Sequence, residues 1–361
     1  MLDALERLVA AESPSADQAA CARCADEVTH VAAELLSGIE PERISVDGAT
    51  HLRWTFGPSR TRVALIGHFD TVWPMGTLAE LPFKVEDGLA WGPGCFDMKA
   101  GIVQGLHALA AVGVDNLDGV ALLLTSDEEI GSPSSRSLVE STARGAHAAL
   151  ILEPGVDGAL KTARKGVGMY RLKVLGRSAH AGLEPENGAN ALAALAAALG
   201  QVSGLGDAAK GTTVTPTTAS AGTARNVVPD FAVCEIDIRG ETADELQRVD
   251  SAIRALAPGV PGTSFEIEGG LNRPPLDAAS SAVLFERAKR IAASIGIGVL
   301  GGQGVGGGSD GNFTAGIGVP TLDGLGAVGD GAHARHEHVV IDAMAPRAEL
   351  LAALVRELLT T

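Results

Sequence analysis

The chain has 361 residues, of which 46% are hydrophobic and 3% aromatic, and its formal net charge is −16. A chain of this length exceeds one small core, so two domains are expected. The acidic balance, without a Lys/Arg block, opposes nucleic acid as a partner. No apolar run is long enough to span a membrane, and the acidic N-terminus does not resemble a signal peptide, so we expect no membrane partner and a cytoplasmic location.

The first part of the chain alternates helix-like and strand-like segments. Short apolar runs bounded by turn residues are typical of buried strands. Their alternation with helices predicts an α/β fold, with an open, mostly parallel sheet and helices on both faces. The expected elements are a helix at 16–36, a strand pair at 43–46 and 51–56, buried strands at 63–67, 91–96, 119–125 and 148–152, and helices at 99–112 and 134–143.

The pattern changes near Gly155. Between residues 168 and 268 the expected order is β-α-β-β-α-β, which is ferredoxin-like. After Pro274 and Pro275 the first pattern returns, with a helix at 280–295, a glycine-dense loop at 301–311 and a terminal helix at 345–359. We therefore expect a discontinuous metal-binding domain at 1–163 and 273–361, interrupted by a smaller α+β domain at 164–272.

Each of the four buried-strand segments stops on a histidine or a carboxylate. Ligands of open α/β sheets lie beyond the carboxyl ends of the strands, so these side chains should converge on one crevice. Oxygen and imidazole ligands suit a divalent metal, without which the cluster would be electrostatically costly. The residues are His68, Asp70, Asp97, Glu128, Glu129 and Glu153, and one ligand from the His-rich segment 332–338 would complete the set.

Two spacings indicate divided roles. His68 and Asp70 share a strand face, so one can bind metal while the other accepts the second imidazole N–H. Glu128 and Glu129 are adjacent and point different ways, so one can hold metal while the other moves a proton, as metal-assisted hydrolysis requires. The simpler alternative for such an acidic run is a solvated loop.

Other motifs have simpler interpretations. Cys21 and Cys24 have C-x-x-C spacing but lie in a helical stretch without a second pair, which favours reduced helix cysteines over a redox or zinc site. Cys95 is expected to be a packing residue. The loop at 306–311 lacks the G-K-[ST] of a phosphate loop, so we expect its backbone N–H groups, including that of Gly308, to face a substrate carboxylate.

Together these motifs resemble the M20 family of dinuclear zinc exopeptidases. Within it the chain is most similar to glutamate carboxypeptidases, with acetylornithine deacetylases and succinyl-diaminopimelate desuccinylases as near relatives. The matching segments, in the family's order, are 67–72, 92–101, 127–132, 152–154, 178–182, 226–229, 306–310, and Ala332-His333 followed by Glu337.

The resemblance implies two Zn²⁺ ions per subunit, with Co²⁺ or Mn²⁺ as alternatives. Asp97 would bridge the ions and precede a cis peptide bond to Met98. The other implied roles are metal ligands at His68 and Glu153 for one ion and at Glu129 and His333 for the other, a general base at Glu128, an orienting carboxylate at Asp70, and substrate-carboxylate contacts at Asn226 and Arg273.

The second domain would form a lid and a homodimer interface. His180 would stabilise the oxyanion from the partner subunit. Glutamate carboxypeptidases carry a lysine in the segment leading into the lid, and that register falls here near Ala159, with Lys161 and Arg164 close by.

The expected function is hydrolysis of an amide bond adjacent to a free α-carboxylate, releasing a C-terminal glutamate or a similar residue from small peptides or N-acyl amino acids. A metal-bridging water would lose its proton to Glu128. One alternative is an N-acyl-amino-acid deacylase of the acetylornithine deacetylase or desuccinylase type. A remoter alternative is a metal-stabilised binding protein without turnover, against which an intact Glu128 argues.

Overall fold

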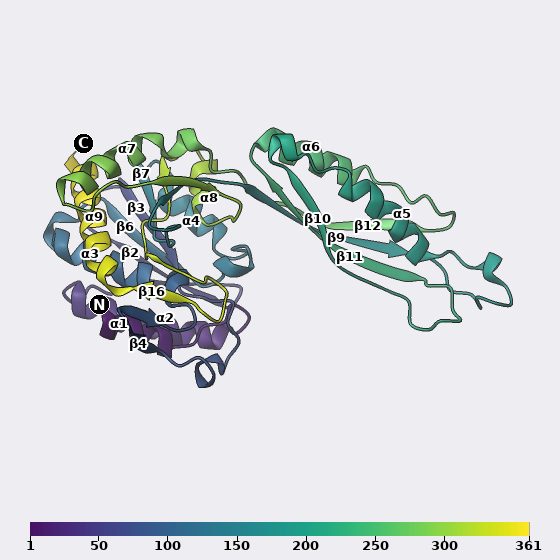
Figure 1. Cartoon of the computed structure of the whole chain (residues 1–361), viewed down its shortest axis with the longest axis horizontal. Helices are drawn as coiled ribbons and strands as arrows, with labels where there is room; N and C mark the ends of the chain where they lie inside the picture. The colour runs from purple at the N-terminus through teal and green to yellow at the C-terminus, as the bar shows by residue number, and fades with distance from the viewer. Residues whose placement is uncertain (361) are drawn as a thin grey trace. The chain divides into compact units, whose positions relative to one another are not determined.

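The computed structural model describes residues 1–360, which divide into two compact units (Figure 1). The first unit comprises Met1–Arg164, Leu276–Val305 and the residues from Ser309 onward. The second comprises Lys165–Pro275 and Gly306–Gly308. Among the described residues, no helix is both long and apolar enough to cross a membrane.

A six-stranded sheet forms the centre of the first unit, in the order β1-β2-β6-β3-β7-β14. Strands β6, β3, β7 and β14 run parallel to one another, whereas β2 pairs antiparallel with β6 on one side and with the edge strand β1 on the other. The expected α/β fold with a mostly parallel sheet is therefore confirmed. The strands are β1 (Glu42–Val46), β2 (Ala49–Thr55), β3 (Val63–His68), β6 (Val120–Thr125), β7 (Ala148–Ile151) and β14 (Thr321–Leu322).

Helices cover both faces of this sheet, because successive side chains of a strand point to opposite sides. On β3, Val63 and Leu65 join the core beneath α2, α3 and α9, whereas Ala64 and Ile66 join the core beneath α4 and α8. The helices of this unit are α1 (Leu2–Ala10), α2 (Gln18–Leu35), α3 (Ala100–Val112), α4 (Arg136–Ala143), α7 (Ala278–Ser294), α8 (Gly311–Gly316) and α9 (Ile341–Thr360).

The strand expected at 91–96 is wrong. Only Leu89–Trp91 is extended, as β5 of a small antiparallel sheet in the order β15-β16-β5-β4. Gly94 then takes a φ of 73°, which a glycine adopts without strain, and turns the chain into the kinked segment Cys95–Lys99 before α3, in which Asp97 and Met98 have non-helical backbone angles. The remaining short strands are β4 (Lys84–Glu86), β15 (Gly329–Asp330), β16 (His338–Val340), and the parallel pair β8 (Leu160–Arg164) and β13 (Gly302–Val305).

The second unit is a four-stranded antiparallel sheet in the order β10-β11-β9-β12. Alternate residues of its strands, such as Leu172 and Ile236, form a separate core with two helices on one face. The elements follow the expected β-α-β-β-α-β order: β9 (Gly166–Leu175), α5 (Ala191–Ser203), β10 (Thr213–Ala221), β11 (Phe231–Gly240), α6 (Ala243–Arg254) and β12 (Ser264–Arg273).

Candidate metal centre

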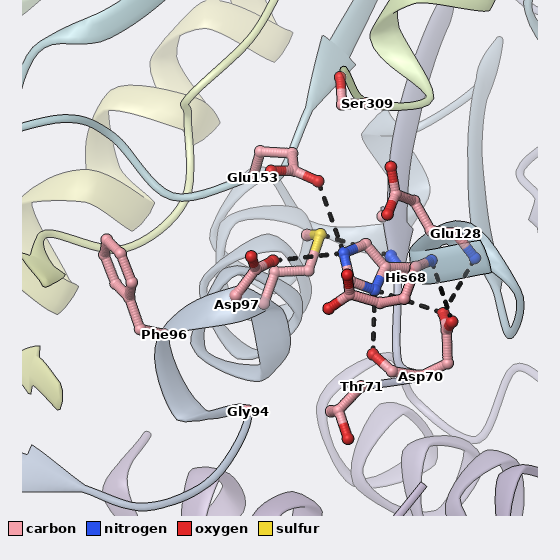
Figure 2. A network of polar contacts seen from close by, with 12 residues as sticks. His68, Asp70, Thr71, Gly94, Phe96, Asp97, Glu128, Glu153 and Ser309 are labelled. Carbon is pink, nitrogen blue, oxygen red and sulfur yellow. Dashed lines mark hydrogen bonds and ion pairs between the residues drawn. The ribbon is translucent and has the colours of Figure 1, made fainter. Parts of the chain in front are cut away.

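The imidazole of His68 lies between two carboxylates at the end of β3 (Figure 2). Its Nε2 is 3.4 Å from Asp97 Oδ1 and 3.5 Å from Glu153 Oε1. Glu153 follows β7, the strand beside β3, and Asp97 lies in the turn before α3. The parallel strands thus bring His68 and Glu153 to one edge of the sheet, where the turn supplies Asp97.

A second cluster shares Asp97. His333 Nε2 lies 3.4 Å from Asp97 Oδ2 and 3.1 Å from Glu129 Oε2. Glu129 belongs to the short turn Glu128–Ile130 after β6, and His333 adopts a φ of 62° in the loop before β16. In each cluster the potential ligand atoms all lie within 4.8 Å of one another.

These residues fit divalent metal ions. The buried atoms His68 Nε2 and Asp97 Oδ1 have no hydrogen-bond partner, which is costly unless something else binds them. Tetrahedral zinc holds nitrogen and oxygen about 2.0–2.2 Å away, so its ligand atoms lie roughly 3.3–3.5 Å apart. The separations of 3.4 and 3.5 Å around His68 match that spacing.

Asp70 organises both the imidazole and the acidic turn. Its main-chain carbonyl oxygen lies 3.1 Å from His68 Nδ1, nearer than its carboxylate at 3.4 Å. With the proton on Nδ1, Nε2 is left as the electron-pair donor. The Asp70 carboxylate instead accepts the backbone N–H groups of Glu128 and Glu129, both at 3.2 Å, and the Ser15 hydroxyl at 2.6 Å. The carboxylate of Asp70 is expected from the sequence to accept the second N–H of His68, but its main-chain carbonyl is the closer group.

The electrostatics of the two clusters follow from burial and opposite charge. Burial lowers the pKa of His68, but Asp70, Asp97 and Glu153 outweigh it and raise that pKa well above its usual value. Asp97 and Glu129 raise the pKa of His333 to about 10. Burial opposes ionisation of Asp97, but the two histidines hold its pKa far below normal. A metal ion must therefore displace protons from both imidazoles.

Glu153 is linked to a buried ion-pair network that the sequence analysis did not identify. Arg164 Nη2 donates to Glu153 Oε2 at 3.0 Å, and the same guanidinium donates to Asp323 at 2.7 and 3.0 Å. Lys161 Nζ lies 3.5 Å from Glu153. Burial and Asp97 raise the pKa of Glu153, but these cations and His68 hold it at about 2. Asp323 directly follows the short strand β14, so it lies at a strand end as Glu153 does.

Glu337 is the second functional candidate without a role in the sequence analysis. Its buried carboxylate accepts four N–H groups around the Asp97 turn, those of Gly94, Phe96, Asp97 and the Trp73 indole. Burial raises its pKa to about 7, although these hydrogen bonds lower it. The Asp97–Met98 peptide bond is cis, as the resemblance implies.

A cavity of about 460 Å³ lies beside this loop. Two of the chain's three tryptophans line it. The surrounding residues include Trp73, Trp91, Leu81, Lys84, Ala334 and Arg335.

The four remaining predicted residues belong to the second unit. The backbone segments of His180 and Asn226 are adjacent, because Ala181 N donates to the Asn226 carbonyl at 2.9 Å. Arg273 ends β12 and is buried, and a Cβ added to Gly308 would lie 2.8 Å from Arg273 Cδ. The structure thus pairs His180 with Asn226, and Arg273 with Gly308.

The cysteines are buried and form no disulfide in the described part of the chain. Cys21 and Cys24 lie in α2, where burial raises the pKa of Cys21 to about 12. Burial also raises the pKa of Cys95. High thiol pKa values disfavour the reactive thiolate.

Comparison with known proteins identifies relatives across most of the chain. Residues 64–357 match the model of peptidase family M20/M25/M40. Carboxypeptidase G2 of Pseudomonas sp. strain RS-16 is 31% identical over 312 residues, covering 84% of this chain and 75% of that protein. The succinyl-diaminopimelate desuccinylase of Azoarcus sp. strain BH72 is 29% identical over 349 residues, covering 90% of each chain.

The fold likeness extends over the whole chain. The M20 family metallo-carboxypeptidase Sso-CP2 from Sulfolobus solfataricus has a TM-score of 0.80 at 16% identity, covering 100% of this chain and 99% of that chain. The aminopeptidase PepT from Bacillus cereus has a TM-score of 0.72 at 22% identity, covering 99% and 97%.

Proposed function

Because the chain belongs to peptidase family M20/M25/M40, we propose that it is a dinuclear metal-dependent hydrolase that cleaves an amide bond adjacent to a free α-carboxylate. The observation that carries this proposal is the pair of clusters sharing Asp97, next to a carboxylate, Glu128, that belongs to neither cluster. A ligand set alone would suit a metal-stabilised binding protein. The adjacent carboxylate supports turnover, since hydrolysis needs a proton acceptor.

The proposed ligands are His68, Asp97 and Glu153 for one ion, and Asp97, Glu129 and His333 for the other. Their imidazole and carboxylate groups suit Zn²⁺, with Co²⁺ or Mn²⁺ as alternatives. When bound, the ions supply Lewis acidity that lowers the pKa of water and polarises a carbonyl.

The protein's own residues would provide the proton transfers. Glu128 accepts the proton of the attacking water and returns it to the leaving amine. Asp70 serves this step by holding the backbone N–H of Glu128 and of Glu129, which keeps the two carboxylates in their separate roles.

For the substrate we favour small peptides or N-acyl amino acids from which a C-terminal glutamate or similar residue is released. The 31% identity to a carboxypeptidase supports this choice, and the desuccinylase relative makes an N-acyl-amino-acid deacylase the second candidate. Arg273, Asn226 and the backbone of Gly308 are the proposed contacts of the substrate carboxylate, for which a guanidinium provides paired donors. Ala159 stands where glutamate carboxypeptidases carry a lysine, so glutamate selectivity needs a direct test.

The deciding experiment combines elemental analysis with a hydrolysis panel of dipeptides and N-acyl amino acids that differ in acyl group and C-terminal residue. We expect close to two divalent ions per chain and metal-dependent release of the C-terminal amino acid. Asp97→Ala should lower the metal content more than any other single ligand change, because it removes a ligand from both ions. Full metal content in Asp97→Ala would contradict the bridging role.

We further propose a homodimer formed through the second unit, in which His180 donates to the oxyanion in the partner's site. Loss of one such donor costs about 10²–10³ in turnover. Homodimers of His180→Ala and of Glu128→Gln should each be nearly inactive, whereas mixed dimers should regain one working site. Verified heterodimers that recover no hydrolytic activity would rule out a role for His180 in the partner's site.

A further inference from the structure

The carboxylate of Glu337 accepts three backbone N–H groups from one short stretch of chain and a fourth N–H from the Trp73 indole. Its Oε1 accepts the backbone N–H groups of Phe96 at 2.9 Å and Asp97 at 3.1 Å. Its Oε2 accepts the Gly94 N–H at 2.9 Å and the Trp73 indole N–H at 2.7 Å. The residue is only 3% exposed. All four donors belong to the turn that carries Asp97 or to the segment beside it.

Among uncharged side chains of the same size, none can replace this carboxylate. Two carboxylate oxygens offer about four lone-pair positions and no hydrogen, whereas a glutamine amide has one accepting oxygen and a donating nitrogen. In Gln, that nitrogen would face two of the N–H donors. A buried charge is retained only where such hydrogen bonds compensate it.

Glu337 also connects the Asp97 turn to the loop of His333. Glu337 and His333 lie in the same short loop, in which the Glu337 backbone N–H donates to the Ala334 carbonyl at 2.9 Å. On its other side, the Glu337 carbonyl accepts the Gly92 N–H at 3.4 Å. The separation of 3.4 Å between Asp97 Oδ2 and His333 Nε2 therefore spans two segments that Glu337 fastens together.

We propose that Glu337 is a positioning residue that fixes Asp97 against His333 for metal binding, and that Trp73 supports it through the indole N–H. The inference rests on the proposed metal-dependent function. Groups that orient metal ligands typically contribute 10–100-fold to metal affinity or activity. Glu337 acts through the backbone of the turn rather than by touching substrate, so its loss should lower kcat much more than it changes KM.

The test compares Glu337→Gln and Trp73→Phe with wild type and with Glu349→Gln, the same isosteric change at an exposed position of α9. The readouts are zinc affinity from chelator competition, the visible spectrum of the Co²⁺-loaded protein, and the unfolding midpoint of the metal-free protein. Glu337→Gln should weaken zinc binding about 10–100-fold and change the Co²⁺ spectrum. Trp73→Phe removes one donor of four and should produce a smaller change in the same direction, whereas Glu349→Gln should match wild type.

Wild-type zinc affinity and Co²⁺ spectrum in folded Glu337→Gln would overturn the inference, even if its unfolding midpoint falls, because that pattern is purely structural. If Glu337→Gln does not fold, the Trp73→Phe variant provides the test. Unchanged zinc affinity in Trp73→Phe would then overturn the inference. Failure of the proposed function looks different, since wild type itself would then bind no stoichiometric zinc.

Discussion

Replacing Glu128 with Gln separates proton transfer from metal binding at the acidic turn after β6. The amide keeps the size of the side chain but cannot accept a proton. The backbone of the turn should stay in place, because the Asp70 carboxylate holds the N–H groups of Glu128 and Glu129 at 3.2 Å each. Glu128 is in neither cluster, so we expect metal content near that of wild type.

Loss of a general base costs about 10²–10⁴ in rate. At about 1.36 kcal/mol per tenfold, this corresponds to about 2.7–5.4 kcal/mol of transition-state stabilisation. The assay is kcat at saturating metal, with metal content measured by elemental analysis on the same preparation. The matched variant is Glu129→Gln, which alters a residue 3.1 Å from His333 and should instead lower metal content.

The reasoning fails if the two variants exchange behaviour. If Glu128→Gln loses metal and recovers activity when zinc is added, then Glu128 is the ligand. If Glu129→Gln keeps its metal and loses turnover, then Glu129 is the base. Wild-type turnover in metal-loaded Glu128→Gln would remove this residue from the mechanism altogether.

Two further predictions concern charge. Arg164→Met leaves the buried carboxylates of Glu153 and Asp323 without their shared guanidinium, and breaking such a buried ion pair costs about 3–5 kcal/mol of stability. Calorimetry of the metal-free variant should therefore show a melting temperature at least about 6 °C below that of wild type. An unchanged melting temperature would refute the stabilising role of Arg164. His333, whose pKa is raised to about 10, contributes ion-pair stability to the metal-free protein that is complete below its unfolded pKa near 6.5 and lost as the pH rises through about 10. Metal binding has the opposite dependence, because the ion needs a neutral imidazole, and zinc affinity should rise about tenfold per pH unit between pH 7 and 9 for each proton displaced. Calorimetry in buffers of different ionisation enthalpy should detect fewer released protons in His333→Ala than in wild type, because only the proton of His68 is then displaced.

The residues at strand ends were the most predictable part of the site. His68, Glu129 and Glu153 each follow an apolar run, and parallel strands place their carboxyl ends at one edge. The same reasoning placed Asp97 beside His68, as the structure does, but through a wrong element. Glycines at positions 92 and 94 turn the chain there, so Asp97 approaches from a kinked turn rather than from a strand.

The residues that support these ligands were harder to predict. Glu337 lies 240 residues from Asp97 in sequence, and nothing in its own segment indicates which backbone groups it binds. Arg164 stood near the expected change of domain, where a surface charge was equally plausible. Asp323 also lies at a strand end, but β14 is only two residues long, so no apolar run revealed the strand.

The ligands obtain their positions from two different sources. His68 and Glu153 lie at the ends of neighbouring parallel strands, and the backbone ladder between β3 and β7 fixes their spacing. Asp97 and His333 lie in turns outside that sheet, where the pairing of β5 with β16 joins the neighbouring segments but ends at Trp91 and His338, before either residue. A buried carboxylate that binds the turn of Asp97 and shares the loop of His333 supplies a restraint there. A positioning role for Glu337 is therefore expected on architectural grounds, because the proposed ligands His68 and Glu153 lie at strand ends that sheet hydrogen bonds hold, whereas Asp97 and His333 do not.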